Sequence, residues 1–395
     1  METEKKSQKT VLVFFLCLLM FAGFVQAKIW YVDAAAGAGG DGQTWATAFD
    51  TIEEAVDAAN NLWYLCQAPF DTIYVKQGTY TLTNQIDVDK VVNIYGGFPN
   101  SMANPAMSDR NWKTYQTIVS GNNAVRCFYV YGYCVIDGFY IRNGSSTNGS
   151  GIYFYSNPVE CSGLSGTYYL SGTINNCEFY NNNTTGSGGA IFIAQTSSSP
   201  NTGSDPLIQN CIFRYNSAAS GGAIYHTYSA PTIKQCIFHH NESTAAGSLG
   251  GGAIAGFSHD YETNLWTTIT NCLFYSNASN SWGGAISYNQ VYPTITNCTF
   301  TLNDTAYAGG GGAFHGNMNS EAPRLWNCIF WDDTPNELDI VTASTYLDVS
   351  YCDVEGGWTG AGSNNINSNP DFVSASNFKL AMGSPCIDTD RKSVV

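Results

Sequence analysis

Residues 294–303 read TITNCTFTLN, and this stretch decides the fold. Cys298 and Phe300 are two residues apart, so they share one face of an extended strand, whose side chains alternate between its two faces. Ile295 lies three residues before Cys298 and would face the other way on a straight strand. All three side chains can reach one core only if the chain bends near Asn297, because asparagine tolerates left-handed backbone angles better than most residues. The stretch therefore predicts a strand, a sharp bend and a second strand.

This pattern recurs along the chain as the motif Asn-Cys-x-Phe-x-x-Asn, once with glutamine at its first position. The complete copies start at Asn176, Asn210, Gln235, Asn271 and Asn297, and degenerate copies follow at Asn327 and around Cys352. A second motif, Gly-Gly-Ala-Ile or Gly-Gly-Ala-Phe, alternates with the first at residues 188–191, 221–224, 251–254, 283–286 and 311–314. Repeats of roughly 20–50 residues indicate stacked units, and the absence of a helical period excludes helical repeats. We therefore predict an all-β fold in which each copy forms one coil of a single-stranded parallel β-helix.

The composition agrees with a strand-rich chain. The 395 residues include 40 glycines, 25 tyrosines and 21 phenylalanines, and only 12% of them are charged, which is about half the usual share. Few charges combined with ordinary hydrophobicity exclude a disordered chain and a charged coiled coil. The formal net charge of −15 argues against nucleic acid and anionic membrane surfaces as partners.

The N-terminus departs from the repeat. Residues 1–27 combine a basic segment, an apolar run and small residues at the cleavage position, which is typical of a signal peptide. The apolar run is too short for a membrane-spanning helix, and no later stretch of the sequence is apolar enough to form one. We therefore expect an exported protein, located outside the cell or on the outer surface of a bacterium.

We expect the mature chain to contain three parts. Residues 28–70 should form an N-terminal cap with a short amphipathic helix, because residues 51–54 match a capping box and repeat folds need covered ends. Residues 71–355 should form the β-helix, and residues 356–389 a closing segment that is truncated. Codons for the last six residues, 390–395, can spell a common sequencing-library adapter, so we expect these residues to be an artefact.

Twelve of the 13 cysteines follow the signal peptide, and an even number in an exported chain is compatible with disulfide bonds. Six of them occupy one inward position of the repeat: Cys177, Cys211, Cys236, Cys272, Cys298 and Cys328. We expect these six to form a buried ladder of free thiols, since a thiol packs as a small apolar group. Cys66, Cys127, Cys134 and Cys161 are less regular, and a bridge among them stays open. The sequence contains no Cys-x-x-Cys pair, so the cysteines do not indicate a metal site.

The residue that follows each inward phenylalanine should point outward. In successive copies this position holds Tyr180, Arg214, His239, Tyr275, Thr301 and Trp331. Stacked coils would bring these side chains into one stripe with a spacing of ~4.8 Å, and rings in such a stripe could stack on sugars. Tyr180, Arg214, His239, Tyr275 and Trp331 are therefore the candidate ligand-binding residues. The alternative is that the rings serve only strand packing.

The repeat resembles that of the chlamydial polymorphic outer membrane proteins, which are surface autotransporters, over residues 176–333. Residues 30–33, 39–42, 45–49, 95–98 and 383–388 are similar to segments of bacterial secreted proteins of the pectate-lyase-like superfamily. This resemblance implies a right-handed β-helix at the cell surface or in the medium. The superfamily includes both enzymes and adhesins, so the resemblance leaves the activity open.

Enzymes of this superfamily imply specific candidates here. Paired aspartates with a histidine would serve a hydrolase, and Asp332, Asp333 and His315 are the residues available. A calcium-dependent lyase would need a basic residue and carboxylate ligands. Its candidates are Arg214 and Lys234 as bases, and Asp205, Glu242, Asp260 and Glu262 as ligands.

None of these residues recurs on adjacent copies, and Asp333 occupies an asparagine position of the repeat. We therefore expect a non-catalytic, adhesin-like or glycan-binding protein without a cofactor, whose partners are glycans or other cell-surface ligands. The alternative is a polysaccharide lyase or glycoside hydrolase that acts on acidic polysaccharides, with calcium as its cofactor in the case of a lyase.

Overall fold

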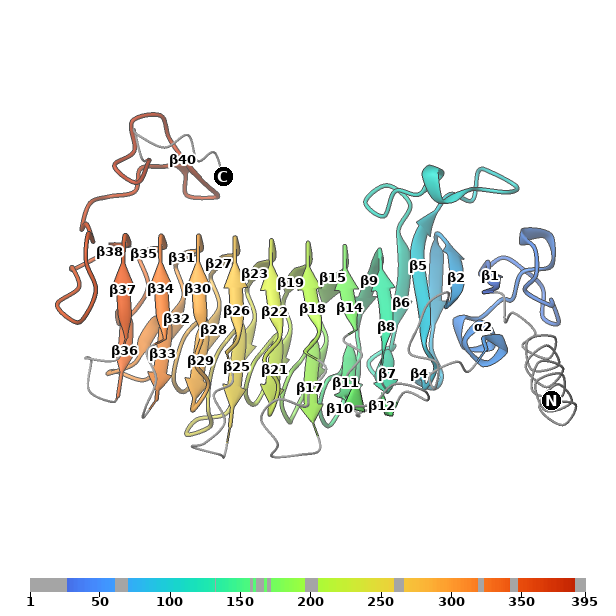
Figure 1. Ribbon diagram of the computed structural model, residues 1–395, viewed down its shortest axis with the longest axis horizontal. Coiled ribbons are helices and arrows are strands. Elements are labelled where there is room, and N and C mark those ends of the chain that lie inside the picture. Colours follow the sequence, from blue (N-terminus) through green and yellow to red (C-terminus); the bar gives the residue numbers. More distant parts are fainter. Residues whose placement is uncertain are drawn as a thin grey trace, which may run out of the picture.

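The protein forms one elongated stack of strands, with a cap at the N-terminal end and a C-terminal segment that returns along the outside of the stack (Figure 1). The computed structural model describes residues 27–60, 70–131, 133–156, 159–160, 167–168, 172–195, 205–258, 266–318, 323–341 and 347–387. Most of the predicted signal peptide, residues 1–26, lies outside the described residues, as do Cys66, Cys161, Asp260, Glu262 and residues 388–395.

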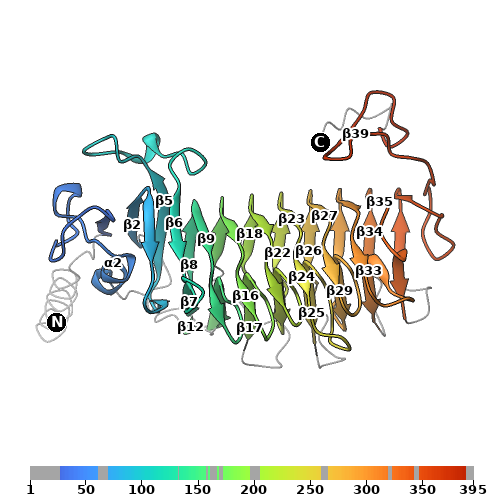
Figure 2. The same ribbon diagram turned by 180° about the vertical axis from the view of Figure 1, so that it is seen from behind.

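One coil of the stack contains four strands. In residues 173–195 these are β14 (Thr173–Asn175), β15 (Glu178–Tyr180), β16 (Asn183–Thr184) and β17 (Ile191–Gln195). Each strand pairs in parallel with the equivalent strand of the next coil, so the coils build four long sheets. We call the sheet that contains β14 sheet A and the sheet that contains β15 sheet B. The sheet that contains β17 is sheet C, and the one that contains β16 is sheet D. This is the predicted right-handed parallel β-helix, seen from behind in Figure 2.

Sheet A has 11 strands: β1 (Ile29–Val32), β2 (Asp71–Lys76), β5 (Val92–Phe98), β8 (Cys134–Asp137), β14, β18 (Leu207–Gln209), β22 (Thr232–Lys234), β26 (Thr268–Thr270), β30 (Thr294–Thr296), β34 (Arg324–Trp326) and β37 (Asp348–Ser350). Sheet B has 10: β3 (Gly78–Thr81), β6 (Thr117–Ser120), β9 (Phe139–Arg142), β15, β19 (Ile212–Arg214), β23 (Ile237–His239), β27 (Leu273–Tyr275), β31 (Thr299–Thr301), β35 (Ile329–Trp331) and β38 (Asp353–Val354).

Sheet C has nine strands: β4 (Ile86–Val88), β7 (Phe128–Tyr131), β11 (Ile152–Ser156), β17, β21 (Ile224–Thr227), β25 (Ile254–Phe257), β29 (Ile286–Asn289), β33 (Gly311–Asn317) and β36 (Asn336–Ile340). Sheet D has six: β10 (Ser145–Ser146), β16, β20 (Ser217–Ala218), β24 (Glu242–Ser243), β28 (Ala278–Ser279) and β32 (Asp304–Thr305). Two antiparallel pairs stand apart, β12 (Val159–Glu160) with β13 (Thr167–Tyr168), and β39 (Phe372–Ser374) with β40 (Asn377–Leu380).

The predicted bend joins sheets A and B in every copy of the repeat. Its residue has a left-handed backbone in each complete copy, with φ between 52° and 55° at Asn176, Asn210, Gln235, Asn271 and Asn297. The bend turns both strands of a coil toward one core, which confirms the parity argument. Gln235 adopts the same angle as the asparagines, so the stacking of neighbouring coils imposes the conformation even where the residue does not favour it.

The Gly-Gly motif forms the turn into sheet C, and each of its two glycines is required for a different reason. Gly221 has φ of 61°, a value that disfavours other residues. A Cβ on Gly222 would lie 2.2 Å from the carbonyl oxygen of Gly252 on the next coil, so that position has no room for a side chain.

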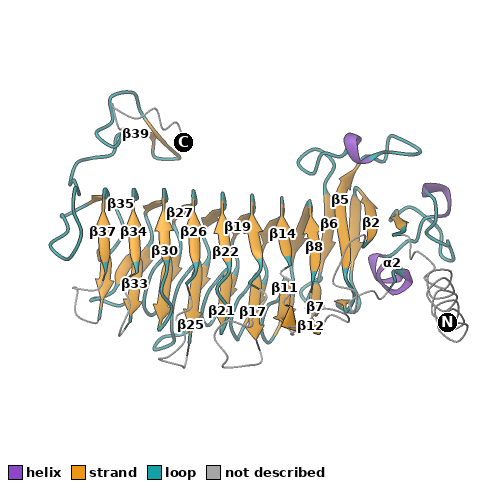
Figure 3. Ribbon diagram, viewed as in Figure 1, coloured by secondary structure: helices purple, strands orange, loops and turns teal. Residues whose placement is uncertain are grey.

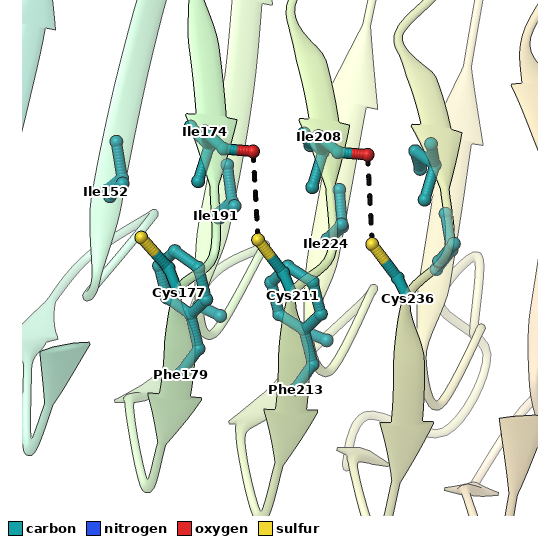
Figure 4. Packing of buried hydrophobic residues seen from close by; sticks show 14 of the residues in the cluster. Ile152, Ile174, Cys177, Phe179, Ile191, Ile208, Cys211, Phe213, Ile224 and Cys236 are labelled. Atoms are coloured by element: carbon teal, nitrogen blue, oxygen red, sulfur yellow. Dashed lines mark hydrogen bonds between the residues drawn. The ribbon is translucent and has the colours of Figure 1, made fainter. Parts of the chain in front are cut away.

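The core consists of ladders of identical side chains (Figure 4). Phe179, Phe213, Phe238, Phe274 and Phe300 stack at centroid distances of 4.6–4.8 Å. The six repeat cysteines are free and buried, as predicted, and the Cys211 thiol donates to the carbonyl of Ile174 at 3.7 Å. Cys127 and Cys134 are also free and buried, so neither forms the bridge that was left open.

A second ladder is polar. The last asparagine of each motif is buried, at Asn182, Asn216, Asn241, Asn277 and Asn303. From Asn216 onward, each Oδ1 accepts bonds from the backbone N–H and the Nδ2 of the asparagine one coil earlier, for example at 3.2 and 2.9 Å from Asn216 to Asn241. The Oδ1 of Asn182, the first member, accepts from the N–H of Gly144. Each Nδ2 also donates to a backbone carbonyl inside the stack. The ladder thereby satisfies the polar groups of the bend after sheet B.

The N-terminal end carries the predicted capping helix, α2 (Ile52–Ala58), shown in purple in Figure 3 together with the 3-10 helices η1 (Trp45–Thr47) and η3 (Met107–Asp109). Thr51 caps α2 by accepting a bond from the N–H of Glu54 at 3.3 Å. Ile52, Ala55 and Val56 are buried in the core of the stack. Within the described residues, the seven residues of α2 are far fewer than a helix needs to cross a bilayer.

Candidate functional site

The predicted outer stripe exists as one column on sheet B. Tyr180 pairs with Arg214, Arg214 with His239, His239 with Tyr275, Tyr275 with Thr301, and Thr301 with Trp331. All but Thr301 are half-buried, and Thr301 is 1% exposed. The alternation along the strands therefore places the candidate residues as predicted; their role in binding stays a prediction.

Contacts within the column use much of its ring surface. The Arg214 guanidinium carbon lies 4.2 Å from the centre of the Tyr180 ring, and its Nε and Nη2 donate to Glu178 at 2.8 and 2.6 Å. The His239 and Tyr275 rings stack at 4.7 Å with 4° between their planes. A sugar packs on the face of a ring, so these rings offer ligands mainly their edges. Trp331 is half-buried and stacks on none of the other described rings.

A second column beside the first was not predicted. The residue after each outward position lies in a left-handed bend, with φ of 56° at Tyr215 and 54° at His240. Tyr215 is 48% exposed, and its ring stacks on His240 at 5.0 Å while its edge meets Tyr180 and His239. The available signal was the parity of the following buried asparagine, which requires a second bend in each motif. Tyr180, Arg214, Tyr215, His239, His240 and Tyr275 form what we call the sheet B aromatic patch.

The patch is close to electrically neutral at neutral pH. Glu178 balances the charge of Arg214, and the Nδ1 atoms of His239 and His240 lie 3.0 Å apart, so one ring donates to the other. Burial, reinforced by His240 and Arg214, lowers the pKa of His239 to about 4. His239 is therefore uncharged near pH 7.

The C-terminal segment covers one end of the patch. Phe378 of β40 packs against Tyr275 at a centroid distance of 5.0 Å, and Phe372 of β39 supports Phe378 edge-on at 5.5 Å. The Cys386 thiol lies 2.9 Å from Oδ2 of Asp353 and ties the segment back to the last coil. The β39–β40 hairpin thus occupies ring surface that a ligand could otherwise use.

Sheet C carries its own column of outward rings. Tyr129, Tyr153, Phe192 and Tyr225 follow one another in register, with centroid distances of 5.1–5.3 Å. Their faces are used by their neighbours, which is the strand-packing role considered as the alternative for outward rings. Outward aromatics alone are therefore a poor indicator of a binding site in this fold.

The Asp332–Asp333 pair has a structural place. Asp333 is buried at the end of the asparagine ladder, where its Oδ1 accepts from the N–H and the Nδ2 of Asn303, both at 2.7 Å. Burial raises the pKa of Asp333 to about 7, and burial together with Asp333 raises the pKa of Glu337 to about 11. His315, the third hydrolase candidate, lies on sheet C and pairs with Asp339 at 2.7 Å. The structure does not bring the three residues together as a hydrolase site.

One further column of sheet C has the residue order of a hydrolytic triad. Ser287, His315 and Asp339 are consecutive in register. However, the Ser287 hydroxyl is buried without a hydrogen-bond partner, and Trp282 stacks over His315 at 4.8 Å. Without a bond between nucleophile and base, and with both residues buried, we assign this column no catalytic role.

The lyase candidates are dispersed. Lys234 lies on sheet A, Arg214 on sheet B and Glu242 on sheet D, while Asp205 accepts bonds from Ala230 N–H and the Ser229 hydroxyl. In the part of the chain that the structure describes, no three His, Cys, Asp or Glu side chains come together to hold a metal ion.

Comparison with known proteins supports the assignment of the repeat. The sequence model of the Chlamydia polymorphic membrane protein repeat matches residues 176–194 and 210–227. A pectate lyase structure resembles the chain with 13% identity and a TM-score of 0.44, covering 92% of this chain and 91% of that one. A rhamnogalacturonan lyase (14% identity, TM-score 0.35, covering 88% and 91%) and a pectin methylesterase from carrot (13%, 0.34, 88% and 88%) are further examples. At these TM-scores none of the three supports an inference about chemistry. No curated protein matches the sequence.

Proposed function

We propose that this protein is an exported, surface-displayed β-helix that binds neutral glycans through the sheet B aromatic patch and catalyses no reaction. The observation that carries the proposal is the continuity of the patch. Three tyrosines, two histidines and one arginine from four successive coils lie side by side, over roughly 14 Å along the stack. Rings beside polar donors are the usual composition of a carbohydrate-binding surface.

The electrostatics of the patch favour neutral over acidic glycans. Arg214 is already paired with Glu178, and the pKa of His239 lies well below neutral pH. A chain of formal net charge −15 would also repel a polyanion at long range. Sugar hydroxyls can instead bond to Arg214 and His240, while the exposed ring of Tyr215 packs against the sugar.

The inference that the protein is displayed on the cell surface rests on its sequence. Residues 1–27 fit a signal peptide, and the repeat matches that of a Chlamydia protein described as a polymorphic membrane protein. A rigid β-helix would present the patch at a fixed distance from its point of attachment. We infer an adhesin-like role from this combination.

A glycan array followed by titration of the confirmed ligand tests the proposal. We expect Tyr215→Ala and His240→Ala to raise the Kd by about tenfold each, since each removes an exposed ring of the patch. Trp326→Ala is the matched control, because Trp326 is 38% exposed on sheet A. Unchanged binding of a confirmed ligand in both variants would contradict the proposal. Release of product from a polysaccharide panel would overturn the non-catalytic assignment.

A further inference from the structure

A pocket of about 570 Å³ lies near the N-terminal end of the stack. Its walls come from four parts of the chain: Glu53 on α2, Asn84 and Gln85 before β4, Asp87 within β4, and Arg126 before β7, with Ser146 of β10. Sheet C begins at β4, whereas sheet D begins only at β10. Within the described residues, the first coils therefore have no sheet D strand, and the pocket lies at the position that such a strand would occupy. Its volume is in the range of small-molecule sites.

Arg126 is held rigidly in the pocket wall. Its Nη1 donates to Oε1 of Gln85 at 2.6 Å, its Nη2 to the Ser146 hydroxyl at 2.7 Å, and its Nε to the carbonyl of Gly149 at 3.0 Å. The guanidinium also lies over the ring of Tyr153, at 5.0 Å from its centre. No carboxylate of the described residues forms an ion pair with Arg126. The neutral partners fix the geometry of the guanidinium and leave its charge unpaired.

Gln85 links this cation to a carboxylate. Its Oε1 accepts from Arg126, and its Nε2 donates to Oδ1 of Asp87 at 2.7 Å. Asp87 has a second oxygen available for a ligand, and Glu53 adds another carboxylate to the lining. The Gln85 bridge therefore holds Arg126 and Asp87 in place, and the exposed Glu53 supplies a further acceptor on the wall.

We propose that this pocket is a second carbohydrate site, which takes a neutral mono- or disaccharide unit. A sugar hydroxyl both donates and accepts, so a ring with several hydroxyls can bond to Asp87, Glu53 and the amides together. Two carboxylates disfavour an anionic ligand, and Arg126 beside them offsets part of their attraction for a cation. The pocket shares no residue with the sheet B aromatic patch, so it does not depend on the function proposed for that patch.

Calorimetric titration with neutral disaccharides, using a uronic acid and an amino sugar as charged probes, tests this site. We expect a neutral sugar to bind, and Asp87→Asn and Glu53→Gln each to raise its Kd by about tenfold. Thermal unfolding of each variant checks that the fold is retained. Tyr215→Ala, which alters the patch, should leave this binding unchanged, and this result separates the pocket from the patch.

Three outcomes would overturn the proposal. One is that no neutral sugar binds to the native protein, and another is that a charged probe binds more tightly than every neutral one. The third is binding that persists in the folded Asp87→Asn/Glu53→Gln double variant but is lost in Tyr215→Ala. That last result would assign all sugar binding to the patch and none to the pocket.

Discussion

The two faces of the sheet B strands follow opposite rules. On the inner face, five successive coils carry phenylalanine, and their rings lie within 2–4° of parallel. On the outer face, one residue further along each strand, the same coils carry tyrosine, arginine, histidine, tyrosine and threonine. Identity between coils is required where a side chain must stack on its own copy, because the interior is closely packed. The outer face is free of that requirement, so its residues can serve recognition.

The largest expected effect is the difference in stability between variants of the inward and the outward residue of one strand. Phe238 is fully buried between Phe213 and Phe274, and Phe238→Ala should lower the free energy of unfolding by about 3–5 kcal/mol through the cavity it creates. His239→Ala, which replaces its outward neighbour, should lower the free energy of unfolding by less than about 1 kcal/mol. Denaturant unfolding measures both. Equal losses would show that the outer column is as structural as the core.

Substitutions in the asparagine ladder should have the second-largest effect on stability. Asn241→Ala leaves the backbone N–H and the Nδ2 of Asn216 without their acceptor in a buried site. We expect a loss of about 2–3 kcal/mol in the free energy of unfolding, which the same denaturant series would measure. Asn183→Ala, at the exposed position directly after a copy of the motif, is the control and should change stability by less than about 0.5 kcal/mol. A ladder substitution without effect would mean that water replaces the missing acceptor.

The end of that ladder should make stability depend on pH. The pKa of Asp333 is raised to about 7 from an ordinary 3.8, so between these values the folded protein holds a proton that the unfolded chain has lost. Glu337 beside it, whose pKa is raised to about 11, holds a second such proton. The free energy of unfolding should therefore fall as the pH rises from about 4 through 7 and on toward 11. Asp333→Asn extends the ladder with a neutral amide and should be about 1–3 kcal/mol more stable than the native protein at pH 8.

Thermal unfolding between pH 4 and pH 9 checks this expectation. The exposed Asp332→Asn variant is the control and should keep most of the native pH dependence. If Asp333→Asn and the native protein gave parallel pH profiles, Asp333 would not be the titrating group.

The smallest expected effect concerns the hairpin over the patch. Phe378→Ala removes the ring that packs on Tyr275 and should change the free energy of unfolding by less than about 1 kcal/mol. It should, however, make Tyr275 several-fold more reactive toward a nitrating reagent, as measured by mass spectrometry of the modified peptide. Val373→Ala, at an exposed position of the same hairpin, should leave the reactivity unchanged. Equal nitration of Tyr275 in both variants would show that the hairpin does not protect the patch.

Most of the fold could be predicted because every coil repeats the same local rule. The offset between Ile295 and Cys298 required a bend, and the structure has a left-handed residue between them at Asn297. The column from Tyr180 to Trp331 followed from the same alternation. Tyr215 and His240 were missed because the parity argument was applied to the first bend of the motif and not to the second.

By itself, the sequence determined the coil, its inward ladders and the identity of the outward residues, because these depend on spacing within one motif. Only the tertiary structure decided which groups meet across motifs. The Arg126 pocket needs α2, β4 and β10 at one place, and the contact of Phe378 with Tyr275 needs the chain to return past three coils. Such contacts depend on how the ends of the stack close, and the repeat contains no information about its own ends.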